Sequence, residues 1–171
     1  MRSSASRVRD FVRAAVRLDW SWTASDLDRL CAVTGWTVTR RSAYGATLAT
    51  DLDVTNPTAS VYTSQDELEY LSVVVLDAAM TGEPNDPDTV LDLFAALGIF
   101  MLDELGEPTT RTPGGEPVIR WDLPNVVVRL NTRGDSMVGL HLLSPEYQKR
   151  EDHYDNEVLP WIRAEQQGGG L

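Results

Sequence analysis

The sequence predicts an α+β fold with a single antiparallel sheet of about five strands and helices on one face. Helical spacing of apolar residues gives way to a period of two after residue 36, returns near residue 87, and is followed by two more strand-like segments. A short polar turn between these last segments predicts a hairpin. No internal repeat or long linker divides the 171 residues, so residues 1–165 are expected to form one domain. The expected order of elements is α(α)-β-β-β-α-β-β-α.

Two helices are expected before the first strand. Residues 4–18 carry apolar side chains at helical spacing, with arginines on the opposite side. We expect this basic amphipathic N-terminal helix (1–17) to pack on its own domain, and binding to an anionic lipid surface is the alternative. The second helix is expected to begin at Thr23, whose hydroxyl would cap it ahead of Asp26, and to end at Gly35. The apolar face of the first helix consists of Val8, Phe11, Val12, Ala15 and Val16.

Three strands are expected next, at residues 46–53, 59–63 and 67–77. The first alternates apolar and polar side chains, as a half-buried strand does. The third has nearly continuous apolar character, which predicts a central strand covered on both faces. A second subunit covering one of those faces is the alternative.

A helix over residues 87–105 is expected to form the centre of the core. Asp86 would cap this helix after a turn at residues 81–86, and Pro87 would occupy its first position, where a missing N–H costs nothing. A broad apolar band that includes Phe94 continues to a glycine, Gly106, which should end the helix.

Two further strands are expected at residues 117–130 and 136–143, the first interrupted by a proline. The turn Thr132-Arg133-Gly134-Asp135 would join them as a hairpin. With the alternate valines and leucines facing the core, Arg129 and His141 lie on the opposite face of the sheet.

The chain is expected to end in a helix over residues 145–158 that Pro160 breaks or kinks. A flexible glycine-rich tail should follow at residues 166–171. The inward side of the helix is expected to consist of Tyr147, Tyr154, Val158 and Trp161.

The net charge of −11 is unevenly distributed along the chain. Residues 1–17 hold five arginines and one aspartate, a net +4, which leaves −15 for residues 18–171. An acidic body repels phosphate backbones, so we expect no nucleic-acid partner. The same charge would speed encounter with a basic protein, although solubility alone also explains it.

The sequence contains no established catalytic, metal-binding or phosphate-binding motif. Asp51 and Asp53 stand two residues apart without a third ligand nearby, and Asp86-Pro87-Asp88 lacks the glycine and closing glutamate of a calcium loop. His141 and His153 have no partner at metal-ligand spacing. We therefore expect a chain that is not an enzyme and that has no catalytic residue, no metal site and no cofactor.

The location expected for this chain is the cytoplasm. A single cysteine fits a reducing compartment, and no apolar run approaches the ~18–20 residues that a membrane-spanning helix needs. The basic N-terminus has too short an apolar run for a secretory signal, so no transmembrane segment or leader is expected.

Four segments carry a family resemblance: LDWSWTASDLDRLCAVTGW (18–36), LGEPTTRTPGGEPVIRWDLPNVVVRL (105–130), LLSPEYQ (142–148) and LPWIRAE (159–165). They resemble an uncharacterised family of small proteins from high-GC Gram-positive bacteria. The resemblance implies a role as an immunity partner of a polymorphic toxin, and it implies no functional residues. The expected order of elements also resembles type III secretion chaperones, in which the face without helices serves for pairing or partner binding.

The function expected from the sequence is therefore a non-enzymatic, acidic protein-binding module, namely an immunity protein that neutralises a polymorphic toxin. The alternatives are a secretion-type chaperone that holds a partner segment along its sheet, and a small enzyme or ligand binder. The expected partner is a basic protein, either a toxin or a secreted substrate, and a homodimer is a further alternative. The candidate contact residues are Asp51, Asp53, Asp66, Glu67 and Glu69, with Arg129 and His141 as secondary candidates.

Overall fold

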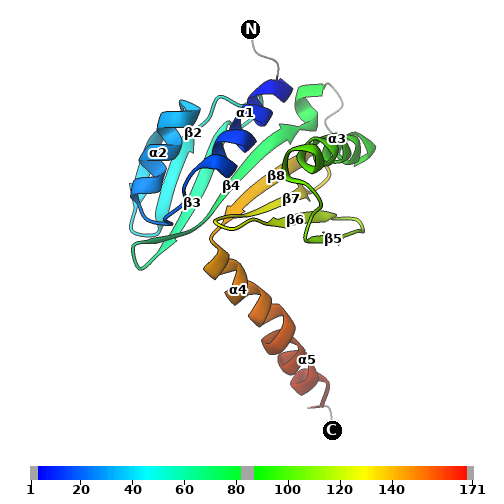
Figure 1. The fold of residues 1–171 in the computed structure, drawn as a ribbon. Helices are drawn as coiled ribbons and strands as arrows, with labels where there is room; N and C mark the ends of the chain where they lie inside the picture. The colour runs from blue at the N-terminus through cyan, green and yellow to red at the C-terminus, as the bar shows by residue number, and fades with distance from the viewer. Residues whose placement is uncertain (1–3, 82–86, 169–171) are drawn as a thin grey trace.

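The fold is built on one antiparallel sheet of eight strands (Figure 1). The computed structural model describes residues 4–81 and 87–168. The helices are α1 (Ser4–Arg17), α2 (Ser25–Thr34), the 3-10 helix η1 (Ala78–Thr81), α3 (Pro87–Leu105), α4 (Pro145–His153), the π-helical η2 (Tyr154–Val158) and α5 (Leu159–Gly168). The strands are β1 (Thr37–Ser42), β2 (Gly45–Ala49), β3 (Thr58–Ser64), β4 (Glu67–Asp77), β5 (Thr110–Thr112), β6 (Val118–Asp122), β7 (Val127–Arg133) and β8 (Met137–Leu143).

The sheet consists of two four-stranded meanders placed side by side. Its strand order is β1-β2-β3-β4-β8-β7-β6-β5, so the pairing of β4 with β8 joins the N-terminal meander to the C-terminal one. Helices α1, α2 and α3 lie on one face of the sheet, while α4, η2 and α5 leave it at the end of β8 (Figure 1). The core lies between the sheet and the first three helices, because the apolar side chains of the strands alternate toward that face.

The prediction of an α+β fold with an antiparallel sheet is confirmed, but the prediction of about five strands was wrong. Two of the missing strands, β1 and β5, are edge strands whose side chains are almost all exposed, so they lack apolar alternation. The third arises because the single strand expected at 117–130 is divided into β6 and β7. The N–H of Leu123 donates to the carbonyl of Val126 at 3.0 Å and closes the turn between them.

The first expected strand, at residues 46–53, is also shorter than predicted. Strand β2 ends at Ala49, and the N–H of Thr50 donates to the carbonyl of Pro57 at 2.8 Å, which closes a loop. Asp51 and Asp53 therefore lie in the loop between β2 and β3 and not on a strand.

Helix α1 packs on its own domain, as its apolar spacing predicts. The side chains of Val8, Phe11, Val12 and Ala15 are at most 3% exposed. The ring of Phe11 stacks on Trp36 with 4.5 Å between centroids. The side of α1 that faces away from the core carries its arginines.

Helix α2 does not begin as predicted. It begins at Ser25, and no side chain caps it, so the expected cap by the hydroxyl of Thr23 was wrong. The carboxylate of Asp26 is completely buried and accepts hydrogen bonds from the backbone N–H groups of Ser21 (2.9 Å) and Trp22 (2.6 Å). Asp26 thereby holds the tight turn before the helix. The end of α2 is as predicted, because Gly35 adopts φ 77° and its N–H donates to the carbonyl of Cys31.

Helix α3 has the bounds predicted from the sequence, and Gly106 with φ 83° follows it directly. Phe94 lies on its buried side and is 8% exposed. The cap expected from Asp86 lies outside the described residues. Because α3 runs along β7 and β8, it covers the C-terminal meander as α1 and α2 cover the N-terminal one.

The C-terminal helices form a projecting arm, defined here as α4, η2 and α5 (Figure 1). The expected burial of Tyr154 and Trp161 was wrong, since they are 46% and 61% exposed. Pro160 does not break the helix, because a π turn precedes it in which the N–H of Leu159 donates to the carbonyl of Tyr154. Residues 166–168 of the expected tail are helical, and 169–171 lie outside the described residues.

Phe94→Ala should lower the free energy of unfolding by roughly 3–5 kcal/mol, because it leaves a cavity under the central helix. Ile99→Ala on the same helix is the control, since Ile99 is 70% exposed and should cost far less. Denaturant unfolding of the two variants measures the difference. Equal losses for the two variants would contradict the placement of α3.

Candidate functional site

The sheet face opposite α1, α2 and α3 is called the open face here. Alternation along the strands decides which side chains reach it. On β4, Leu71 and Val73 are buried against the helices, and Ser72 between them points to the open face. On β8, Leu140 and Leu142 are buried in the same way and place His141 on the open face. The open face is therefore polar at the centre of the sheet.

The register of all eight strands aligns polar side chains in one continuous line across the open face, called the polar row here. Each member is the direct cross-strand partner of the next. In a sheet, such partners lie about 4.5–5.5 Å apart. From β1 to β5 the polar row consists of Arg40, Thr47, Ser60, Ser72, His141, Arg129, Arg120 and Thr110.

Arg133 lies across the sheet beside the centre of the polar row. Its guanidinium starts on β7, passes over β8 and donates a hydrogen bond to the hydroxyl of Ser72 on β4. Gly139 lies next to this crossing side chain, and a Cβ there would lie 3.1 Å from Cδ and 3.2 Å from Nε of Arg133, so the arginine would have to shift by a few tenths of an ångström. The missing side chain at Gly139 thus leaves room for Arg133 over the paired strands β4 and β8, where the two meanders meet.

His141 stands between two arginines at this joint. Burial, and after it the positive charges of Arg129 and Arg133, lower the pKa of His141 from 6.5 to about 4. The imidazole is consequently neutral at pH 7. The positive charge at the centre of the open face comes from Arg129 and Arg133.

Helix α4 covers one margin of the open face. Arg120 donates to both oxygens of Asp152 (2.7 and 2.8 Å) and to Asp122 (2.6 Å), and these contacts raise its pKa. Tyr147 of α4 lies against Tyr70 with 5.1 Å between ring centroids. Of the arginines of the polar row, Arg120 is thus neutralised within the chain and serves to hold α4 in place.

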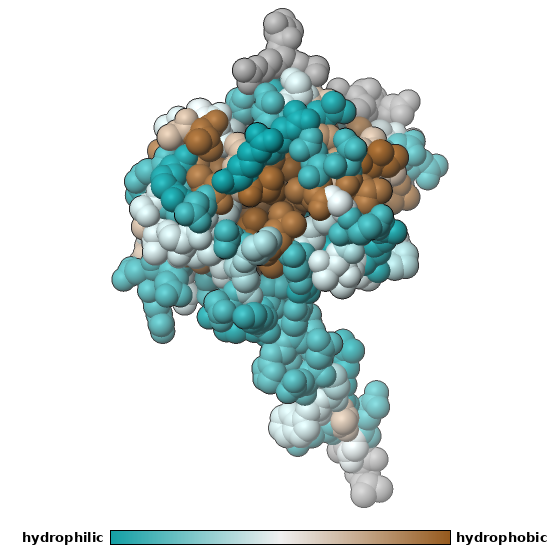
Figure 2. Space-filling model, in the orientation of Figure 1, coloured by the Kyte–Doolittle hydropathy of each residue, from teal (hydrophilic) through white to brown (hydrophobic). Residues whose placement is uncertain are grey.

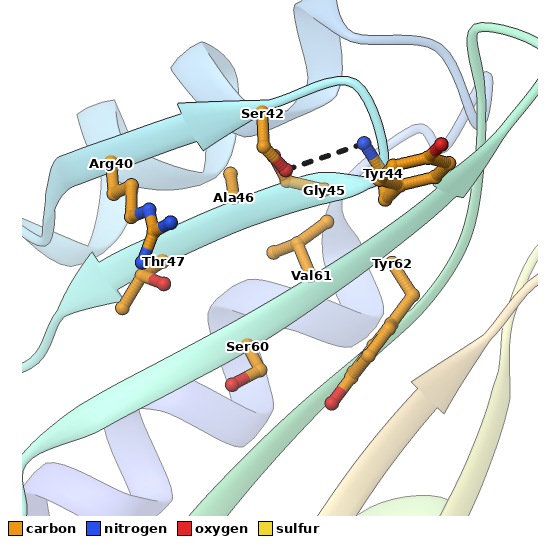
Figure 3. Close-up of a pocket in the computed structure, with 9 residues that line it drawn as sticks. All are labelled: Arg40, Ser42, Tyr44, Gly45, Ala46, Thr47, Ser60, Val61 and Tyr62. Carbon is orange, nitrogen blue, oxygen red and sulfur yellow. Dashed lines mark hydrogen bonds between the residues drawn. The ribbon is translucent and has the colours of Figure 1, made fainter.

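Two hollows lie next to each other on the open face. Figure 3 shows the first, of about 260 Å³, over β1, β2 and β3, with Tyr44 and Tyr62 at its end and Arg40 over Thr47. Gly45 in its floor has no room for a side chain, since a Cβ would lie 1.9 Å from the carbonyl oxygen of Val61. The hollow depends on this close approach of β2 to β3.

The second hollow, of about 430 Å³, lies over β3, β4 and the start of β8. Ser60, Tyr62, Ser72 and Arg133 line it. Ser60 and Tyr62 border both hollows, so the two adjoin at β3, and Ser60 and Ser72 of the polar row line the second. Such a surface suits hydrogen bonding to a partner, because it offers arginine and hydroxyl donors side by side.

The structure does not bring the five predicted acidic residues together. Asp51 and Asp53 sit at the loop before β3, whereas the other three flank the turn after β3, about 20 Å away by strand length. Arg7 donates to the carbonyl of Asp51 (2.7 Å) and to the carboxylate of Asp53 (3.1 Å), so this pair anchors α1.

The acidic residues around the β3–β4 turn differ in their contacts. Glu69 forms an ion pair with Arg150 of α4 at 2.7 Å. Asp66 and Glu67 are exposed, and Asp66 occupies the turn with φ 66°. Of the residues predicted from the sequence, Arg129 and His141 are direct neighbours on the open face.

Two further observations bear on chemistry. In residues 4–81 and 87–168, no group of three or more histidine, cysteine, aspartate or glutamate side chains could hold a metal ion. Burial and the nearby Asp28 raise the pKa of the Cys31 thiol, which keeps it protonated at neutral pH.

A comparison with protein families matches residues 6–144 to a family of unknown function, DUF6301. The chain belongs to the DUF6301 family. The match extends from α1 to Ser144, the residue that caps α4, so it includes the whole sheet and all of the polar row, while the arm follows it. No curated protein and no solved structure matches the chain. None of the helices in the described part of this DUF6301 member is long and apolar enough to cross a membrane.

Most of the polar row was missed by sequence reasoning. Arg40, Ser60, Ser72, Arg120 and Arg133 were not predicted as contact residues, because the row exists only through the pairing of strands that are distant in sequence. The one local signal was alternation, which placed Arg129 and His141 opposite the core. A glycine at 139 beside Arg133 was a second signal, and it becomes informative only with the register known.

The imidazole of His141 should remain neutral down to pH 5. Because folding lowers its pKa, protonation of His141 favours the unfolded state. His141 therefore takes nothing from the free energy of unfolding above pH 6.5, and it lowers that free energy as the pH falls from 6.5 toward 4. NMR of the His153→Gln variant, which leaves a single imidazole, measures it between pH 8 and pH 5. A titration with a midpoint near pH 6.5 would contradict the described surroundings of His141.

Proposed function

We propose that this chain is a non-enzymatic protein-binding module of the immunity type, which neutralises a toxin by contacting it with the open face of its sheet. The observation that carries the proposal is the polar row, which crosses all eight strands on a face that α1, α2 and α3 leave uncovered. A sheet that only needed a water-exposed surface has no requirement for aligned arginine, serine and histidine side chains next to exposed tyrosines.

The size and composition of the open face support this proposal. Eight strands spaced at ~4.8 Å give a width of about 35 Å, which is sufficient for one side of a stable protein–protein interface. Arginine and tyrosine are enriched at such interfaces and often contribute most of the binding energy. Tyr44 and Tyr62 are 81% and 43% exposed beside the first hollow.

The charge of the chain supports a partner that is basic as a whole. A net charge of −11 attracts a basic domain over a distance of about one Debye length, ~8–10 Å. At the centre of the contact, Arg129 and Arg133 would bind carboxylate or carbonyl oxygens of the partner. The acidic residues of the chain would thus attract the partner at long range, and Arg129 and Arg133 would contact it directly.

The second candidate function is a secretion-type chaperone, and the hollows beside Tyr44 and Tyr62 favour it. They would accept side chains of an extended segment laid along the sheet. An immunity protein binds a folded toxin domain, whereas a chaperone of this kind binds a segment without tertiary structure. The state of the bound partner therefore distinguishes the two.

The proposal predicts that a neighbouring gene encodes a toxin domain, and the test is co-expression of that domain with this chain in a heterologous host. Intact chain should restore growth, and Arg129→Ala combined with Arg133→Ala should abolish the rescue and weaken binding by roughly 2–5 kcal/mol. Arg17→Ala on the helix-covered side is the matched control and should rescue fully. Asp66→Lys with Glu67→Lys should slow association and leave dissociation nearly unchanged.

Full rescue by the Arg129 and Arg133 variant, with binding unchanged, would contradict the assignment of the open face. Binding of an isolated peptide from the neighbouring gene product, together with no binding of the folded domain, would favour the chaperone. Thermal unfolding of each purified variant shows whether a loss of rescue reflects a loss of folding.

A further inference from the structure

The helix-covered side has an apolar groove between α1 and α3. Figure 2 shows apolar side chains gathered there, beside the polar band of α1. The groove has a volume of about 190 Å³ and is bordered by Arg9, whose guanidinium lies 4.9 Å from the ring centroid of Phe100. Its lining consists of Ala5, Val8, Leu76, Leu93, Ala96, Leu97 and Phe100.

The arm has the complementary properties. Tyr154, Val158, Trp161 and Ile162 recur at helical spacing, and none of them is buried. Acidic residues lie before this stripe, between its members and after it. Over the whole arm, three basic side chains (Lys149, Arg150, Arg163) stand against Glu146, Glu151, Asp152, Asp155, Glu157 and Glu165. An acidic helix with an aromatic stripe is thus matched to an apolar groove with a basic border.

The arm cannot reach the groove of its own chain. The ion pairs Arg120–Asp152 and Arg150–Glu69 fix α4 at the margin of the open face, and the groove lies on the other face of the sheet. Beyond these contacts the arm runs away from the body for about 25 Å (Figure 1). Only a groove in another molecule is available to it.

We propose that the arm of one copy docks into the α1–α3 groove of a second copy, and that two such contacts form a two-fold symmetric dimer. Trp161 and Tyr154 supply the apolar anchors, and the carboxylates beside them face the arginines of α1. Reciprocal exchange gives a closed assembly, because each copy uses its arm and its groove once. The open face of each copy remains accessible.

The test is the oligomeric state of the purified full chain, measured by light scattering and sedimentation over a range of concentrations. The intact chain should form a dimer. Tyr154→Asp combined with Trp161→Asp, and separately Ala96→Glu in the groove, should each raise the dissociation constant of the dimer more than about tenfold. Ala95→Glu is the matched control, since Ala95 is also exposed but lines the opposite side of α3, and this variant should still dimerise.

Mixing the two defective variants provides a second readout. The arm variant retains its groove and Ala96→Glu retains its arm, so the mixture should form a heterodimer with one intact contact, although each variant alone is monomeric. A monomeric intact chain at every concentration would overturn the proposal. So would an Ala96→Glu variant that dimerises like the intact chain, which would indicate pairing of arm with arm, a mixture without association, or an effect of Ala95→Glu equal to that of Ala96→Glu.

Discussion

The antiparallel pairing of β4 with β8 is the interaction on which the rest of the structure depends. It is the place where two meanders that are each local in sequence become one sheet. On the helix side, Leu71 lies opposite Leu142 and Val73 opposite Leu140, and all four are buried. A slip of one residue would turn these side chains to water, so burial of apolar surface fixes the register.

The same register creates the polar surface on the other side of the joint. Once the leucines and valines are fixed, Ser72 must lie beside His141, and Arg133 reaches Ser72 by passing next to Gly139. The hydrophobic effect thus sets the positions of polar side chains that gain little from being together. Burial and the neighbouring Arg129 and Arg133 keep His141 neutral at pH 7, since all of them lower its pKa.

The sequence predicted those parts of the structure that depend on neighbouring residues. Helix α3, the glycines that end α2 and α3, the burial of Phe94 and the outward direction of Arg129 and His141 all follow from local periodicity and turn chemistry. Edge strands β1 and β5 were missed, because an edge strand exposed on both faces has no apolar period to detect. The polar row was missed because it requires the register between strands that are about 70 residues apart.

For the arm, the local structure was predicted correctly and the surface that it packs against was not. Its aromatic spacing correctly predicted a helix with an apolar side, and the side was wrongly assigned to the core of the same chain. Amphipathic periodicity shows that a helix has a face to bury and does not show which molecule provides the partner surface. In this chain, the two surfaces proposed for binding lie on opposite sides of the sheet: the open face, and the groove between α1 and α3 on the helix-covered side.

The register between β4 and β8 is the most direct test of this account, because the core, the polar row and the position of Arg133 all follow from it. Interstrand NOEs between backbone protons in the isotope-labelled protein measure it. The account predicts NOEs that connect Ser72 with His141, and Leu71 with Leu142. Hα–Hα or HN–HN NOEs that instead connect Leu71 or Val73 with His141 would place the polar and apolar side chains on opposite faces from those described, and would contradict the account.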